Sequence, residues 1–162
     1  MKHRWHTAWD GHDIAVYRDD AEVDRVSSEA IRRVIFVYRA SGGSPGDLLY
    51  ALVETDADFV LLAAETGFAG RVNFERLPFW MAHNCVYWVP QAAAVLPLRL
   101  RRGGGWFGLG RQEFRRVPKS ELDAAVAGWP LEGPQTWDQR KWQRIERNRP
   151  FAALELPGRV RT

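Results

Sequence analysis

The 162-residue sequence contains a single cysteine and only three lysines, Lys2, Lys119 and Lys141. Cys85 has no partner within the chain, so an internal disulfide and a zinc site built on paired cysteines are both excluded. Because lysine is scarce, arginine carries nearly all the positive charge behind the formal net charge of +3. An arginine bias of this kind often follows genome composition, so the basic charge alone is weak evidence for an anionic partner.

Long hydrophobic runs and the pattern of a secretory signal are also missing. The longest apolar run, residues 86–98, is interrupted by Pro90, Gln91 and Pro97, whereas a transmembrane helix needs about 20 apolar residues. Residues 1–11 are charged and aromatic and lack an apolar centre. We therefore expect a cytoplasmic protein without a transmembrane segment.

The sequence lacks the recognised motifs of nucleotide and hydrolase sites. Residues 41–46 and 103–110 are rich in glycine, but neither has the lysine and hydroxyl residue that end a phosphate-binding loop. His83 and Cys85 would lie roughly 6 to 7 Å apart on a strand, which is too far for a nucleophile and its base. We predict no catalytic residue and no cofactor, and we expect Cys85 to be buried in the core.

One cluster near the start of the chain has metal-ligand character. It comprises His3, His6, His12, Asp10 and Asp13, which are residue types that suit a divalent metal ion. Their spacing matches no recognised ligand pattern, and a chain terminus seldom holds ligands rigidly. We therefore expect a loosely ordered N-terminal segment over residues 1–12 and predict no metal site.

The first two thirds of the chain show the pattern of an antiparallel sheet. Alternating polar and apolar residues, or runs of β-branched and aromatic residues, predict strands. The segments concerned are 13–18, 31–38, a hairpin of 47–55 and 58–65, 85–89, and a last pair of 95–100 with 106–117. The carboxylates Glu54, Asp56 and Asp58 surround the hairpin turn, where we expect them to be solvated.

The last third of the chain predicts helices. Ser120 is a suitable N-cap for a helix that ends at Gly128, with a core-facing stripe of Leu122, Ala125 and Val126. Thr136 caps a second predicted helix that runs to about residue 148. The helical part thus covers residues 118–149, and an extended tail covers 150–162.

The predicted fold class is α+β, within a single domain over residues 1–162. It consists of a twisted antiparallel sheet of about six to eight strands, followed by two C-terminal helices. This order of elements, a strand meander and then a helix, is similar in architecture to that of pleckstrin-homology-like barrels; a sandwich is the alternative. No motif accompanies the similarity, and a fold does not determine a function.

Arginines and tryptophans of the second half form the candidate binding residues. In the predicted helix 136–148, an arginine stripe lies beside a separate aromatic arc, and further arginines flank the glycine-rich stretch 103–110. The complete set is Arg101, Arg102, Arg111, Trp137, Arg140, Trp142, Arg144 and Arg147.

The eight tryptophans of the chain give the positive evidence for function. Tryptophan and arginine are the residue types most enriched in interface hot spots. We therefore expect a small non-catalytic binding module, most simply one with a protein partner, and the oligomeric state stays open. The alternative is a binder of nucleic acid or of an anionic surface that uses the C-terminal arginines. A third interpretation is an enzyme with an unrecognised site.

Overall fold

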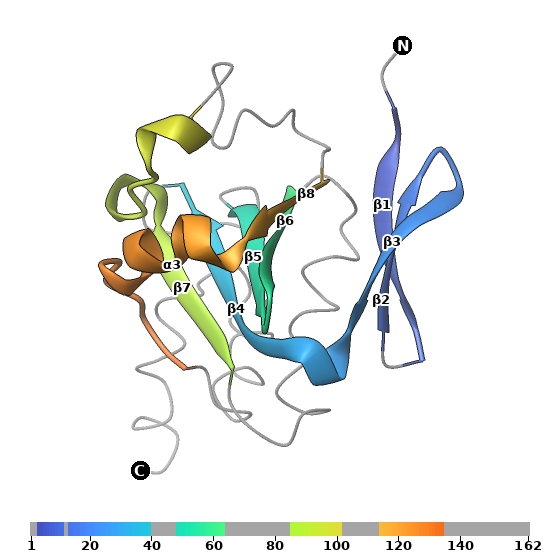
Figure 1. The fold of residues 1–162 in the computed structure, drawn as a ribbon, viewed down its shortest axis with the longest axis horizontal. Coiled ribbons are helices and arrows are strands. Elements are labelled where there is room, and N and C mark those ends of the chain that lie inside the picture. Colours follow the sequence, from blue (N-terminus) through green and yellow to red (C-terminus); the bar gives the residue numbers. More distant parts are fainter. Residues whose placement is uncertain (1–2, 12, 40–47, 64–84, 102–113, 135–162) are drawn as a thin grey trace, which may run out of the picture.

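The structure is a computed structural model that describes residues 3–11, 13–39, 48–63, 85–101 and 114–134 (Figure 1). The described strands form a three-stranded sheet, in the order β1-β2-β3, and a five-stranded sheet, in the order β7-β4-β5-β6-β8. Helix α3 (Lys119–Ala127) follows the last of these strands and packs on the larger sheet. The fold class is therefore α+β, as predicted.

The three-stranded sheet is built from β1 (Trp5–Asp10), β2 (Asp13–Arg18) and β3 (Ala21–Ser27). β2 and β3 are joined by a two-residue turn at Asp19 and Asp20, whose φ angles are 51° and 67°. Positive φ at both positions is the geometry of a type I′ turn, which suits the twist of a hairpin. The strand β2 was predicted, but the expectation of a loosely ordered segment over residues 1–12 was wrong for β1, which pairs with β2 along its whole length.

β3 forms one edge of this sheet. A bulge where β2 passes from Val16 to Tyr17 breaks the regular pairing of the two strands, and most β3 side chains are exposed. Glu22 and Arg25 bond to each other along this edge, with Arg25 Nε 2.7 Å from Glu22 Oε1. The edge is therefore bulged and charged.

β4 (Ile31–Tyr38) is an interior strand of the five-stranded sheet, between β7 and β5, and its run of β-branched and aromatic residues predicted a buried strand here. β5 (Leu48–Thr55) and β6 (Asp58–Ala63) form the predicted hairpin, and β8 (Phe114–Pro118) pairs antiparallel with β6. β7 (Val86–Pro90) lies on the other side of β4 and runs parallel to it. The strands are thus not the continuous antiparallel meander that we expected.

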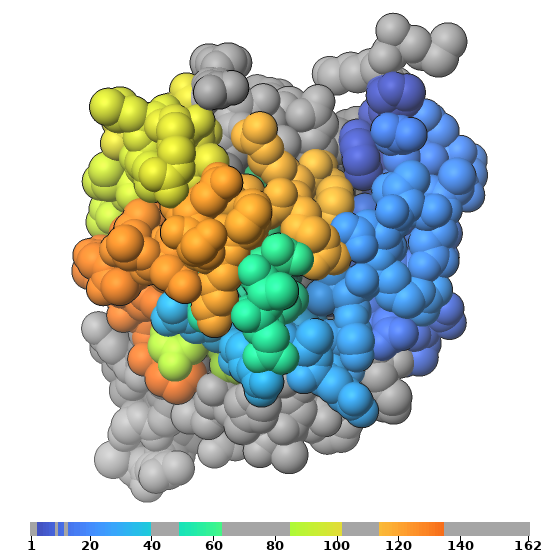
Figure 2. All heavy atoms as spheres, in the orientation of Figure 1, coloured from blue at the N-terminus to red at the C-terminus, as the bar shows by residue number. Residues whose placement is uncertain are grey.

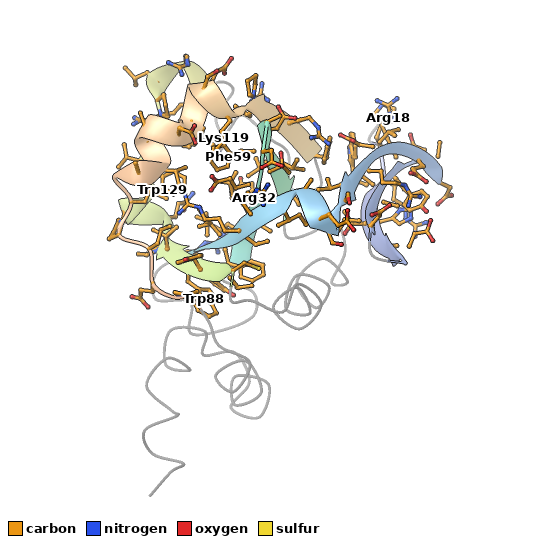
Figure 3. The ribbon with its side chains drawn as sticks, turned by 60° about the horizontal axis from the view of Figure 1, so that its bottom comes forward. Arg18, Arg32, Phe59, Trp88, Lys119 and Trp129 are labelled. Carbon is orange, nitrogen blue, oxygen red and sulfur yellow. The ribbon has the colours of Figure 1, made fainter. Side chains whose placement is uncertain are left out.

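Both faces of β4 are buried, because different elements cover the two sides of the sheet. Val34, Phe36 and Tyr38 belong to one apolar cluster, which the three-stranded sheet completes with Ile14, Val16 and Val26. Ile35 and Val37 belong to a second cluster, which α3 completes with Leu122 and Val126. Figure 3 shows Phe59 and Trp129 on the side of α3 and Trp88 on the other side.

α3 begins one residue before the predicted N-cap. Pro118 occupies the N-cap position and Ser120 lies within the first turn, while Gly128 ends the helix as predicted. Proline is tolerated where the backbone N–H would have no partner within the helix. The expected second helix, residues 136–148, and the tail lie outside the described residues.

The chain returns from α3 to the edge of β7 that lies opposite β4. The backbone of Glu132 exchanges two hydrogen bonds of 2.8 Å with that of Trp88. Gly133 follows with φ +123°, and a Cβ there would lie 2.9 Å from the carbonyl oxygen of Val86. Only glycine fits this close approach without strain.

Candidate interaction surface

A segment interrupted by prolines follows β7 and, among the described residues, carries the most exposed large apolar side chains. It contains two single-turn 3₁₀ helices, η4 (Gln91–Ala93) and η5 (Leu98–Leu100). We had expected residues 95–100 to be a strand, and that prediction was wrong. Pro97 has no N–H for a strand ladder, and its fixed φ suits the start of a 3₁₀ turn.

Side chains of this segment point alternately into the core and outward. Ala94, Leu96 and Leu100 are buried against the second apolar cluster. Val95 is 58% exposed and Leu98 is 80% exposed. We call residues 95–101 the Leu98 loop; Figure 2 shows it in yellow at a corner of the molecule, beside the orange helix α3.

Three side chains fix the backbone of the Leu98 loop or join it to α3. The indole Nε1 of Trp129 donates to the carbonyl oxygen of Val95 at 3.0 Å. Arg101 Nε donates to the carbonyl oxygen of Leu96 at 2.7 Å, and Arg99 Nη2 donates to the carbonyl oxygen of Glu121 in α3 at 2.7 Å. The exposed apolar side chains therefore stand on a backbone that is held in place before any partner arrives.

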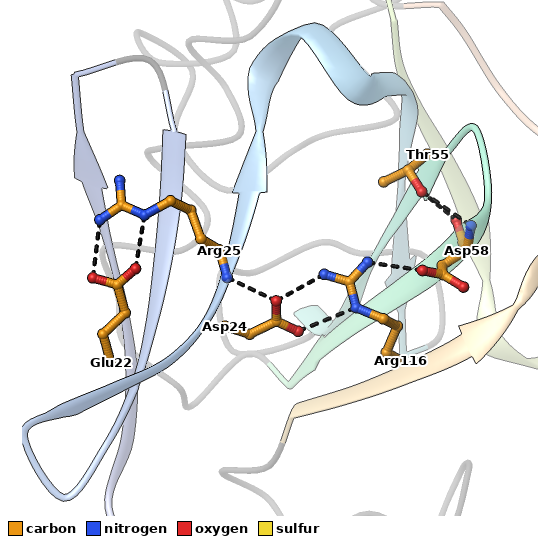
Figure 4. A network of polar contacts seen from close by, with 6 residues as sticks. All are labelled: Glu22, Asp24, Arg25, Thr55, Asp58 and Arg116. Carbon is orange, nitrogen blue, oxygen red and sulfur yellow. Dashed lines mark hydrogen bonds and ion pairs between the residues drawn. The ribbon is translucent and has the colours of Figure 1, made fainter.

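The arginines elsewhere in the described residues are bonded differently. Arg116 in β8 donates to Asp24 of β3 at 2.9 Å and to Asp58 of β6 at 2.9 Å, and so joins the two sheets (Figure 4). The hydrogen bond to Asp24 raises the pKa of Arg116. A stack of Trp5 on Phe114, with ring centroids 6.0 Å apart, joins the same two sheets.

A second ionic cluster lies where α3 meets the sheet. The carboxylate of Glu54 accepts from Arg33 and from Lys119, whose Nζ is 3.0 Å away. The Glu54 side chain is only 10% exposed, and Arg33 also lies over the ring of Tyr87. The prediction that this carboxylate is solvated was therefore wrong, because a basic residue of α3 and another of β4 enclose it.

The other two carboxylates of the β5–β6 turn also have basic partners. Asp56 Oδ1 lies 2.5 Å from Arg32 Nε, and this hydrogen bond holds the pKa of the Asp56 carboxyl below its usual value. Asp58 bonds to Arg116. We call the ion pairs of these acidic residues with their basic partners the ionic seam. Its members are Asp24 and Asp58 with Arg116, Glu54 with Arg33 and Lys119, and Asp56 with Arg32.

The N-terminal cluster of histidines and aspartates is divided among several contacts. His3 Nδ1 lies 2.5 Å from Asp19 Oδ2, and His6 stacks on Tyr17. Asp10 and Asp13 both face Arg25. His12 is not among the described residues, and in the remainder no group of three or more potential ligands is arranged to hold a metal ion.

Only one predicted binding residue, Arg101, falls in the part of the chain that the structure describes. The exposed apolar residues of the same loop, Val95 and Leu98, were not predicted as binding residues. The remaining predicted binding residues, which lie outside the described ranges, are Arg102, Arg111, Trp137, Arg140, Trp142, Arg144 and Arg147.

Buried aromatic and thiol groups serve the core. Trp88 is fully buried and Trp129 is 7% exposed, so these two tryptophans contribute to packing and not to an open contact surface. Cys85 is buried, as predicted.

None of the helices that the structure describes is long and apolar enough to cross a bilayer. Comparison of the chain with protein-family models, with curated protein sequences and with solved structures finds no match.

Proposed function

We propose that this protein is a non-catalytic binding module that docks through the Leu98 loop. The observation that carries the proposal is that strongly exposed apolar side chains stand on a loop whose backbone is fixed by hydrogen bonds. Leu98 and Val95 expose apolar surface, while hydrogen bonds from Trp129, Arg99 and Arg101 hold or brace the loop that bears them. A contact made by a preorganised loop loses little conformational entropy on binding.

The energetic reason is the hydrophobic effect. Burial of a leucine side chain is worth about 1.5 to 3 kcal/mol relative to an exposed one. A single exposed leucine on a protein surface is common and needs no explanation. Two exposed apolar residues on one braced loop, with an arginine on each side of Leu100, form a more specific contact surface.

The alternative is a nucleic-acid binder. Arg99 and Arg101 are exposed within the Leu98 loop, and their charge favours this alternative. Against it, Arg25, Arg32, Arg33 and Arg116 already bond to carboxylates of the same chain. A parent protein retained on heparin at low salt and released as salt rises would favour this alternative.

Two further expectations stay proposals. We propose that residues 136–148 form a second helix after α3. The order of elements would then be strands followed by helices, similar to that of pleckstrin-homology-like barrels. A cytoplasmic location accords with a chain that has one cysteine, since disulfides are rare in that compartment.

Photo-crosslinking in living cells tests the proposed docking surface. A photoreactive amino acid is placed at position 98, at 95, or at 23, where Val23 is 43% exposed on β3 and serves as the control. We expect one defined adduct, with lipid or with protein, from positions 95 and 98 and none from position 23. Equal labelling from all three positions, or none from 98, would contradict docking through the loop.

A further inference from the structure

The arginines of the Leu98 loop are fixed in place, and no carboxylate among the described residues pairs with them. Arg99 and Arg101 bond to backbone carbonyl oxygens, which carry no net charge. In the ionic seam, by contrast, Arg116 bonds to two carboxylates. The loop therefore keeps positive charge beside its exposed apolar side chains.

Each of these guanidinium groups has hydrogen-bonding capacity left. An arginine side chain has five N–H donors, and the bond that Arg99 or Arg101 makes to a carbonyl oxygen uses one of them. Such groups bind phosphate oxygens well, because both the charge and the planar geometry match. The other N–H groups belong to side chains one and three positions after Leu98 in the sequence.

The size of the apolar patch indicates what kind of surface it fits. A stable protein interface buries about 800 Å² on each partner and involves roughly 20 to 30 residues a side, whereas the Leu98 loop offers two exposed apolar side chains. A lipid bilayer needs no matching pocket. Apolar side chains enter the boundary between headgroups and acyl chains, while nearby arginines stay at the level of the phosphates.

We propose that the Leu98 loop docks on an anionic lipid bilayer, with Leu98 and Val95 in the interfacial region and Arg99 and Arg101 on lipid phosphates. This inference rests on the proposed function, because it names the partner of the same loop. The cytoplasmic leaflet carries a negative surface potential that attracts arginines near it. A protein with an acidic pocket is the competing occupant, and it is an outcome of the test below.

Vesicle co-sedimentation of the full chain tests the inference. The probes are vesicles of phosphatidylcholine alone and vesicles of phosphatidylcholine with about 30% phosphatidylserine. The phosphatidylserine gives the second vesicles a negative surface potential. We expect the parent to bind the anionic vesicles, to bind the neutral ones more weakly, and to dissociate from the anionic ones as salt rises.

Matched variants separate the two parts of the loop. Leu98→Gln removes the exposed leucine and should weaken binding to anionic vesicles roughly tenfold or more; Val23→Thr, at an exposed valine on β3, is its control and should change little. The double variant of Arg99→Gln and Arg101→Gln should bind anionic vesicles about 25-fold more weakly than the parent, about fivefold for each arginine. Arg18→Gln, at an exposed arginine of β2, is the control for charge.

A fluorescence measurement reports insertion directly. Cys85 is buried, so Leu98→Cys supplies the reactive thiol for an environment-sensitive dye, and Val23→Cys supplies the control. A blue shift with anionic vesicles at position 98 and none at position 23 is expected. The inference is overturned if the parent does not prefer anionic vesicles, or if the controls lose as much binding as the loop variants. A defined protein adduct at position 98 without vesicle binding would overturn the bilayer and leave the proposed function standing.

Discussion

The ionic seam and the Leu98 loop use the same residue type for opposite purposes. In the seam, Arg116 meets Asp24 and Asp58, and the Glu54 carboxylate meets Arg33 and Lys119, so charges are matched within the chain. In the loop, Arg101 bonds to a carbonyl oxygen and keeps its charge. The comparison teaches that the number of arginines says little about binding until the acceptor of each guanidinium is known.

The largest expected effect contrasts a core residue with the exposed leucine of the Leu98 loop. Phe36 is 1% exposed on the interior strand β4, so Phe36→Ala should destabilise the protein by about 3 to 5 kcal/mol. Leu98→Ala should change stability by less than about 0.5 kcal/mol, because the side chain is exposed. Urea denaturation measures both values. A Leu98→Ala variant as unstable as Phe36→Ala would show that the loop is part of the core.

The next effect concerns the most buried member of the seam. Glu54→Gln leaves Arg33 and Lys119 without their shared carboxylate, and breaking a buried ion pair is strongly destabilising. Both basic groups keep about 30% of their side-chain surface exposed, so we expect a reduced loss of about 2 kcal/mol. Asp56→Asn, in the exposed pair with Arg32, is the control and should cost clearly less. Equal losses in the two variants would refute the distinction between buried and exposed pairs.

A smaller effect is expected where the seam joins the two sheets. Arg116→Gln removes the ion pairs to Asp24 and Asp58 and should lower the free energy of unfolding by about 1 kcal/mol, after allowance for solvent screening. Hydrogen exchange should increase in the three-stranded sheet more than in β4 and β5. Arg101→Gln in the loop should not have that effect; if it loosens β1 to β3 equally, the two regions are not independent.

The smallest effect is a dependence on pH. The hydrogen bond from Arg32 lowers the folded-state pKa of Asp56 below the ordinary value of 3.8. A carboxylate with a depressed pKa adds stability that is fully present above its unfolded pKa and is lost as pH falls through its folded pKa. The difference in Tm between the parent and Asp56→Asn should therefore be constant near neutral pH and shrink below about pH 4. A difference that grows on acidification would contradict the sign of this shift.

Strands with an uninterrupted local pattern could be predicted from the sequence. Residues 31–38 form an unbroken run rich in β-branched residues, and the hairpin around Asp56 joins two apolar runs by a short turn. Both elements are present as predicted. β3 was missed because its bulge places two residues opposite one and so interrupts the alternation with period two. β1 carried a usable signal, since Trp5, Thr7 and Trp9 alternate with smaller or polar residues before a glycine turn.

Long-range features left no local trace in the sequence. The parallel pairing of β7 with β4 depends on how the chain crosses over the sheet, which periodicity does not report. Ala94, Leu96 and Leu100 are spaced like one face of a strand, yet Pro97 turns the chain into 3₁₀ geometry. The candidate surface was missed for the same reason: the acceptors of Arg99 and Trp129 lie 22 and 34 residues away along the chain.

The bulged, charged edge of β3 bears on how this protein behaves when crowded. An open strand edge is a template onto which another molecule can add a strand, and that is a common beginning of aggregation. At this edge the Glu22–Arg25 pair would have to be desolvated, and the bulge would break the register of an incoming strand. Along β3, therefore, a molecule that exposes an apolar loop at one corner has a strand edge that discourages the addition of another strand.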